Sequence, residues 1–154
     1  MSSPIAVFPG TFDPITIGHV SIVQRALPLF GKVIVGMGVN TTKQTMFDVE
    51  QRLAWIRHAF AGDARVEAMA FEGLTVDLCK TVGARFILRG LRNSTDHGYE
   101  RSIALMNRQL ADVETIFLPS APEHAHISST IVRELIANKA DVSALVPMDL
   151  RPSR

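Results

Sequence analysis

The residues best placed to do chemistry in this sequence lie between positions 9 and 19, directly after a short apolar run. The segment reads Pro-Gly-Thr-Phe-Asp-Pro-Ile-Thr-Ile-Gly-His. Gly10 and Gly18 let the backbone approach a ligand closely, and Thr11 supplies a hydroxyl. We expect His19 to open a helix, whose free N–H groups and positive dipole end favour an anion. The segment therefore predicts a strand that leads into a nucleotide-phosphate site.

These residues need elements to position them, and the hydrophobic pattern predicts strands that alternate with helices. Short runs rich in Val, Ile and Phe predict strands at 4–8, 32–39, 65–71, 85–89 and 113–118. Apolar residues at helical spacing predict helices at 19–30, 49–61 (with Asp48 as N-cap), 74–82 and 95–110. Alternation of this kind is typical of an α/β protein whose parallel sheet is covered on both faces. Ligands bind at the carboxyl ends of such strands, so we expect five loops to converge there: 9–18, 40–47, 71–75, 89–94 and 118–128.

Three of these loops carry further polar residues, each with a plainer interpretation beside the functional one. Lys43 is a mobile cation suited to phosphate, or else a solvated surface lysine. Arg89 and Arg92 suit bidentate contacts with phosphate oxygens, or else are ordinary surface arginines. The hydroxyls of 128–130 line a phosphate pocket, or else cap a helix start.

The helix predicted at 95–110 has two distinct lines of residues. An apolar stripe at i, i+4, i+7 and i+11 spacing is expected to face the core: Tyr99, Ile103, Met106 and Leu110. A polar line abuts this stripe and either contacts a ligand or marks the boundary with water: Asp96, Glu100 and Asn107.

The composition is that of one soluble globular domain. The 154 residues are 47% apolar and 20% charged, and the formal net charge is +1. Such a balance gives no general electrostatic argument for nucleic-acid or membrane partners, and no apolar run is long enough to span a bilayer. The single Cys79 excludes an internal disulfide and a multi-cysteine zinc site, and it suits a reducing compartment. We therefore expect one cytoplasmic domain over 1–154, with a poorly ordered tail from about residue 149.

Taken together, the motifs resemble those of the bacterial phosphopantetheine adenylyltransferases. They run in the family's order across residues 4 to about 147: 8–19, Lys43 with Met46-Phe47, Arg-Gly-Leu-Arg at 89–92, Tyr99-Glu100, Met-Asn-Arg-Gln-Leu at 106–110, and Ile-Ser-Ser-Thr at 127–130. The opening motif alone is shared with other nucleotidyltransferases of the His-x-Gly-His type. In this sequence Thr16 replaces the first His of that motif. The segments at 89–92 and 106–110 narrow the resemblance to this one family.

The resemblance implies a fold, a reaction and partners. The fold would be a Rossmann-like nucleotidyltransferase domain with a five-stranded parallel sheet and helices on both faces. The reaction would transfer AMP from ATP to 4′-phosphopantetheine, giving dephospho-coenzyme A and pyrophosphate, with Mg²⁺ accompanying ATP. The protein would be a homohexamer under coenzyme A feedback, with no nucleic-acid or membrane partner.

The resemblance also implies roles for individual residues. The catalytic set would be His19, Thr11, Lys43 and Arg92, with His19 donating to the α-phosphate of ATP in the transition state. Thr11, Lys43, Thr75 and Arg89 would bind the phosphopantetheine substrate. ATP would contact Thr11, Phe12, His19, Gly90, Leu91, Arg92, Glu100, His124, Ala125, His126, Ile127, Ser128, Ser129 and Thr130. None of these residues is expected to hold a metal by itself.

The sequence departs from the family pattern at positions that bear on substrate contacts rather than on the reaction, and two alternative functions stay open beside the resemblance. Ile17 stands where Asn is common, Thr45 where Pro is common, and His124 where an aromatic ring often lies that could stack on adenine. One alternative is a cytidylyltransferase acting on a phospho-alcohol, although its closing Arg-Thr-x-Gly-Ile-Ser-Thr-Thr motif does not match residues 123–130. The other is a non-catalytic nucleotide-binding protein of the same fold, which would be expected to have lost His19, Lys43 or an arginine of 89–92.

Overall fold

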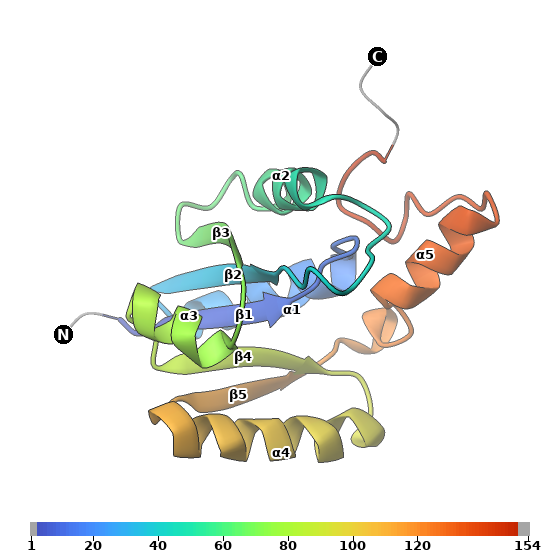
Figure 1. The fold of residues 1–154 in the computed structure, drawn as a ribbon. Helices are drawn as coiled ribbons and strands as arrows, with labels where there is room; N and C mark the ends of the chain where they lie inside the picture. Colours follow the sequence, from blue (N-terminus) through green and yellow to red (C-terminus); the bar gives the residue numbers. More distant parts are fainter. Residues whose placement is uncertain (1–2, 151–154) are drawn as a thin grey trace.

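The computed structural model describes residues 3–150 and has the alternating elements that the hydrophobic pattern predicts (Figure 1). In chain order they are β1 (Ile5–Gly10), α1 (Ile17–Ala26), a 3₁₀ turn (Leu27–Leu29), β2 (Lys32–Gly38), α2 (Val49–Ala59), β3 (Val66–Phe71), α3 (Thr75–Val82), β4 (Phe86–Leu91), α4 (Ser94–Ala111), β5 (Glu114–Pro119), a second 3₁₀ turn (Pro122–His124) and α5 (Ser129–Ala137). The predicted α/β class is therefore confirmed. Most of the tail predicted to be poorly ordered, 151–154, lies outside the described residues.

The five strands form one sheet in the order β3-β2-β1-β4-β5, and every neighbouring pair is parallel. The chain moves outward from β1 on one side to β3 and then crosses to β4 and β5 on the other side. The carboxyl ends therefore share one edge, and the arrowheads of β1, β4 and β5 point toward α5 in Figure 1. The order reverses direction beside β1, and this is where a parallel sheet opens a crevice for ligands.

Alternate residues of the central strands face opposite sides of the sheet and enter two separate cores. Ala6 and Phe8 of β1 pack with buried residues of α1 and α2, whereas Val7 packs with Leu78 and Cys79 of α3. The stripe predicted for the first helix is buried, including Ile22, Val23, Ala26 and Phe30. The packed helices hold the strand ends, and hence the loops between them, in fixed positions.

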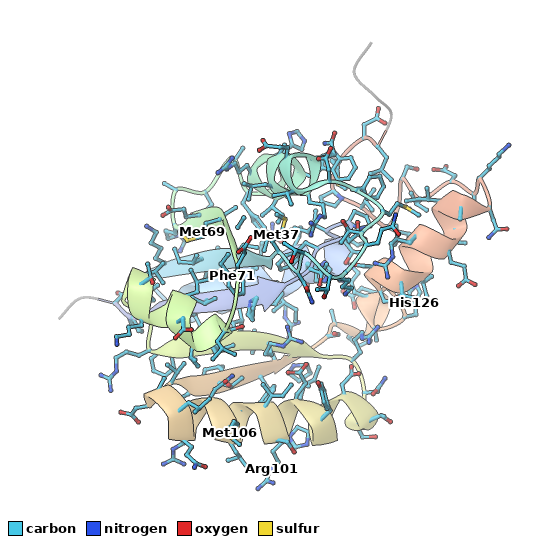
Figure 2. The ribbon with its side chains drawn as sticks, viewed as in Figure 1. Met37, Met69, Phe71, Arg101, Met106 and His126 are labelled. Carbon is cyan, nitrogen blue, oxygen red and sulfur yellow. The ribbon has the colours of Figure 1, made fainter. Side chains whose placement is uncertain are left out.

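Helix α4 lies where it was predicted, but its predicted packing is wrong. In α4, which the structure describes throughout, no residue is buried. The apolar stripe expected to face the core is exposed: Tyr99 is 73% exposed, Ile103 39%, Met106 52% and Leu110 59%. The helix runs beside β5, the edge of the sheet, and Figure 2 shows Arg101 on the side of the helix away from the sheet. At a sheet edge the described chain offers this stripe too little surface to cover it.

Within the described residues, no helix is long and apolar enough to cross a membrane.

Candidate functional site

The loops that leave the carboxyl ends of the strands line two adjoining cavities. One cavity, of about 360 Å³, has polar walls from the loop after β1, Lys43, the end of β4 and residues 120–133; we call it the polar cavity. The other, of about 410 Å³, lies between the sheet and α4; its lining residues are apolar and polar in equal measure, but its surface is more apolar than polar, and we call it the apolar cavity. Residues that form part of both walls mark the junction where the cavities meet: Pro9, Gly10, Thr11, Arg89 and Glu100. The predicted convergence of the five loops is thus confirmed.

A larger hollow, of about 950 Å³, lies between the end of α2 and residues 136–150 and is lined by a separate set of residues. None of the residues predicted to bind ATP or the acceptor is among the described residues that line it. Size therefore does not identify the site in this protein; the position at the strand ends does.

Most of the residues predicted to form the site lie in the walls of the two cavities. The polar cavity is lined by Thr11, Phe12, His19, Lys43, Arg89, Gly90, Arg92, Glu100, His124, Ile127, Ser128, Ser129 and Thr130. The apolar cavity includes Thr75 at the start of α3 and Phe71 at the end of β3, which Figure 2 labels. Of the described residues predicted to bind ATP, Leu91, Ala125 and His126 lie outside both walls. His126 is exposed on the segment before α5.

His19 is held by its own helix start. The helix begins at Ile17, so His19 is its third residue rather than its first, and Thr16 is the N-cap. The backbone N–H of Thr16 donates to His19 Nδ1 over 3.0 Å, and the N–H of His19 donates to Thr16 Oγ1 over 3.4 Å. Because Nδ1 accepts from a backbone N–H, the proton of the neutral ring is on Nε2. The imidazole can therefore donate one hydrogen bond into the polar cavity.

The same surroundings keep this imidazole neutral. Burial, together with the positive charges of Arg89 and Arg92, lowers the pKa of His19 to about 4. The ring also makes an edge contact with Phe12, whose centroid lies 5.0 Å away. At neutral pH, His19 is thus a fixed neutral donor next to two cations.

Arg89 lies at the junction of the cavities in a fixed position. Its Nε and Nη2 donate to the two carboxylate oxygens of Glu100, and its Nη1 donates to the carbonyl oxygen of Pro9 over 2.8 Å. Arginine carries five N–H donors, so two more remain for an oxygen of a ligand. Arg92, which precedes α4, is more exposed and pairs with Asp96 in the first turn of that helix, with 3.3 Å between Nε and Oδ2. One arginine is thus prearranged, and the other can move.

The start of α5 contributes both capping and cavity hydroxyls. Ser128 Oγ accepts from the N–H of Ile131 over 3.2 Å, which is the capping role. Ser129 Oγ donates to the carbonyl oxygen of Pro14 over 2.8 Å and so attaches α5 to the first loop. Because Ser128, Ser129 and Thr130 also line the polar cavity, the amino-terminal end of α5 faces it. The two interpretations offered for these hydroxyls are therefore compatible.

The contacts of two buried charged residues that support the site were missed from the sequence. Arg52 of α2 is only 3% exposed and donates to the carbonyl oxygens of Thr11 and Phe47. Asp13 is only 4% exposed and accepts from the backbone N–H groups of Met46 and Phe47. A signal for Arg52 was present, because its position falls beside Ile56 on the inward face of the predicted helix. No local sequence pattern predicts the hydrogen bonds that Asp13 accepts from Met46 and Phe47.

Two buried polar atoms of the described residues have no hydrogen-bond partner, and each belongs to a residue in one cavity wall. They are Oγ1 of Thr115, at the apolar cavity, and Nδ1 of His124, at the polar cavity. Buried polar groups are normally paired, so these two atoms are exceptions among the described residues. Among residues 3–150, no group of three His, Cys, Asp or Glu side chains is arranged to hold a metal ion.

Comparisons with known proteins agree with this geometry. Residues 7–135 match the cytidylyltransferase-like family. A phosphopantetheine adenylyltransferase of Flavobacterium psychrophilum is 49% identical over 146 residues, which cover 95% of this chain and 97% of that protein. One of Bacteroides thetaiotaomicron is 46% identical over 142 residues, covering 92% and 94%. One of Limosilactobacillus reuteri is 44% identical over 147 residues, covering 95% and 85%.

Among solved structures, a bifunctional NMN adenylyltransferase/ADP ribose pyrophosphatase from Francisella tularensis has the same fold, with a TM-score of 0.74. The sequences are 18% identical, and the alignment covers 95% of this chain but 45% of that one. This chain therefore spans about half the length of that protein. The likeness extends to the fold alone.

Proposed function

The chain belongs to the phosphopantetheine adenylyltransferases, within the cytidylyltransferase-like family, and we propose that it transfers AMP from ATP to 4′-phosphopantetheine. The products are dephospho-coenzyme A and pyrophosphate, which makes the reaction a step of coenzyme A biosynthesis. The observation that carries the proposal is the junction of a polar and an apolar cavity at Thr11, Arg89 and Glu100. Nucleotide phosphates suit the first cavity, and a phosphorylated arm of amide and methylene groups suits the second.

The reaction requires the protein to align the two substrates and to stabilise negative charge; it does not require a catalytic base. An oxygen of the acceptor phosphate, already anionic at neutral pH, forms a bond to the α-phosphorus of ATP. The bond from that phosphorus to the bridging oxygen of the β-phosphate breaks, and pyrophosphate leaves with the electron pair. Catalysis of this kind depends on alignment and on stabilising the charge that builds on the phosphoryl oxygens.

The charged residues divide this work between the two phosphates. His19 donates from Nε2 to an oxygen of the α-phosphate, and the mobile Lys43 and Arg92 follow the triphosphate as pyrophosphate forms. The two remaining N–H donors of Arg89 bind the acceptor phosphate, with the hydroxyl of Thr11 beside it. Glu100 keeps the Arg89 guanidinium turned toward the junction.

The non-reacting ends of the two substrates lie along the remaining walls of the two cavities. His124 lies beside the nucleotide, with Ile127 and the 128–130 hydroxyls near it. The side chain of Asn107 suits an amide of the pantetheine arm. Phe71 provides apolar contact for its methylene groups.

We propose that Mg²⁺ arrives bound to ATP. The acidic side chains of the polar cavity already bind protein groups: Asp13 binds two backbone N–H groups, Asp96 binds Arg92, and Glu100 binds Arg89. Mg²⁺ retains several waters and commonly uses substrate phosphates as ligands, so triphosphate oxygens and water can hold it without a dedicated protein site.

Assembly, feedback and location belong to the same proposal. The exposed apolar stripe of α4 supports association of copies, which we propose as a homohexamer. Coenzyme A contains both the adenylate and the pantetheine arm, so it can occupy both cavities and inhibit by competition. One buried cysteine and no disulfide suit the reducing cytoplasm.

The test measures pyrophosphate released by the purified protein from Mg-ATP with and without 4′-phosphopantetheine. A parallel reaction contains Mg-CTP and glycerol 3-phosphate. Release that requires both ATP and 4′-phosphopantetheine is the expected result. Release from the CTP pair alone would indicate a cytidylyltransferase, and no release from either pair would indicate a non-catalytic nucleotide-binding protein.

A further inference from the structure

Lys43 occupies an exposed segment whose local contacts do not fix its position. Residues 41–44 are exposed, and the backbone N–H groups of Thr42 and Lys43 donate to Asn40 within the same turn. Yet the proposed reaction requires the ammonium group at the triphosphate. The location of the Lys43 ammonium group therefore depends on the contacts that hold this segment against the rest of the protein.

Asp13 holds the segment at Met46 and Phe47, three and four residues after Lys43. Oδ2 of Asp13 accepts from the N–H of Met46 over 2.9 Å, and Oδ1 accepts from the N–H of Phe47 over 3.0 Å. Arg133 of α5 lies 3.9 Å from Oδ2 and donates to the carbonyl oxygen of Asp13 over 2.8 Å. A buried carboxylate is stable only with such compensation, and here the compensation consists largely of two adjacent backbone groups of the Lys43 loop.

Arg52 makes a second attachment of the same loop. Its Nε donates to the carbonyl oxygen of Phe47 over 3.0 Å, and its Nη1 donates to that of Thr11 over 2.8 Å. Trp55, on the same helix, makes an edge contact with the Phe47 ring at 4.7 Å between centroids. One guanidinium thus joins the Lys43 loop to the loop that carries Thr11.

We propose that Asp13 and Arg52 are positioning residues of the transfer reaction, which act by holding the Lys43 loop against the loop after β1. Neither residue needs to touch a substrate, because each acts through backbone groups of residues 46–47 and 11. The inference rests on the proposed function and adds to it the device that brings Lys43 to the phosphates.

The test is a double-mutant cycle on kcat with four proteins: wild type, Asp13→Asn, Lys43→Ala and the double variant. Asn has the shape of Asp, but its NH₂ group opposes one of the two N–H donors. Asp13→Asn should lower kcat by about 10- to 100-fold while the Kd for ATP changes by less than about threefold. In the Lys43→Ala background the same change should alter kcat by no more than about twofold.

The matched control is Asp48→Asn, the same replacement at the N-cap of α2. Asp48 accepts from the N–H of Gln51, and Asn caps helices as well as Asp does, so kcat should stay within about twofold of wild type. A general structural defect would instead lower kcat equally with and without Lys43. Equal losses in both backgrounds, or an unchanged kcat in Asp13→Asn, would overturn the proposal.

If Asp13→Asn does not fold, Arg52→Lys enters the same cycle, because lysine keeps the charge and loses the fork between two carbonyl oxygens. A loss of kcat that appears when Lys43 is present and not in the Lys43→Ala variant supports the proposal. An equal loss of kcat in both overturns it. An inactive wild type would refute the proposed function and not the attachment. The attachment is then judged by amide exchange of Met46 and Phe47, which should accelerate at least about tenfold in Asp13→Asn and not in Asp48→Asn. Equal exchange in the two variants would overturn it.

Discussion

His19 presents a neutral imidazole to the polar cavity, with Nδ1 occupied by the N–H of Thr16 and the donor on Nε2. A donor fixed where charge develops contributes more to the transition state than to the bound substrate, and removing one commonly costs about 100- to 1000-fold in kcat. We expect His19→Ala to lower kcat by about this factor and to raise the Kd for ATP by only about two- to fivefold. Steady-state kinetics and calorimetric titration with ATP measure the two quantities. Equal losses in both would assign His19 to ground-state binding.

The lowered pKa of His19 also links stability to pH. An imidazole in the unfolded chain has the ordinary pKa of 6.5, whereas burial and the neighbouring arginines lower the folded value to about 4. Between these values the unfolded state binds a proton that the folded state does not, so the free energy of unfolding falls as pH falls. The loss attributable to His19 grows as the pH falls from 6.5 and levels off below about pH 4, where it amounts to roughly 3 kcal/mol.

Urea unfolding of wild type and His19→Asn at pH 7.5, 6.5, 5.5 and 4.5 isolates this contribution. The free energy of unfolding of wild type should decrease relative to that of the variant as the pH is lowered. A difference that stays constant across this range would show that the imidazole titrates normally in the folded protein.

At the scale of elements, strands and helices were predictable because each is encoded by local periodicity. The stripe of α1, for instance, needs only Ile22, Val23 and Ala26 at helical spacing to predict both the helix and its buried face. The convergence of loops followed from the parallel sheet without any contact being known. Secondary structure and the place of the site were therefore accessible from sequence.

The contacts that position the site were not accessible in the same way. Asp13 and the N–H groups of Met46 and Phe47 are more than 30 residues apart, and nothing in the periodicity pairs a carboxylate with particular backbone groups. Helix α4 shows the other limit. An apolar stripe predicts that a face is to be covered, but not whether the covering surface belongs to the same chain.

At the scale of the whole molecule, α4 leaves a hydrophobic surface that the described chain does not use. Tyr99 and Ile103 border the apolar cavity, so a ligand accounts for part of their exposure. Met106 and Leu110 are 52% and 59% exposed and lie outside the described walls of both cavities. We propose that these two side chains belong to the contact through which copies associate in the proposed hexamer.

A single charge placed on this surface tests the association. Met106→Glu should shift the protein from six times the chain mass to smaller species in sedimentation velocity, because a carboxylate would lose its water at the contact. Its circular dichroism should remain that of wild type, since Met106 is not part of the protomer core. Arg101→Glu is the matched control, because it places the same carboxylate on α4 about 140° around the helix from Met106. Equal dissociation by both variants, or a Met106→Glu protein that stays assembled, would show that the contact lies elsewhere. A wild type that sediments as a single chain would show that there is no such contact.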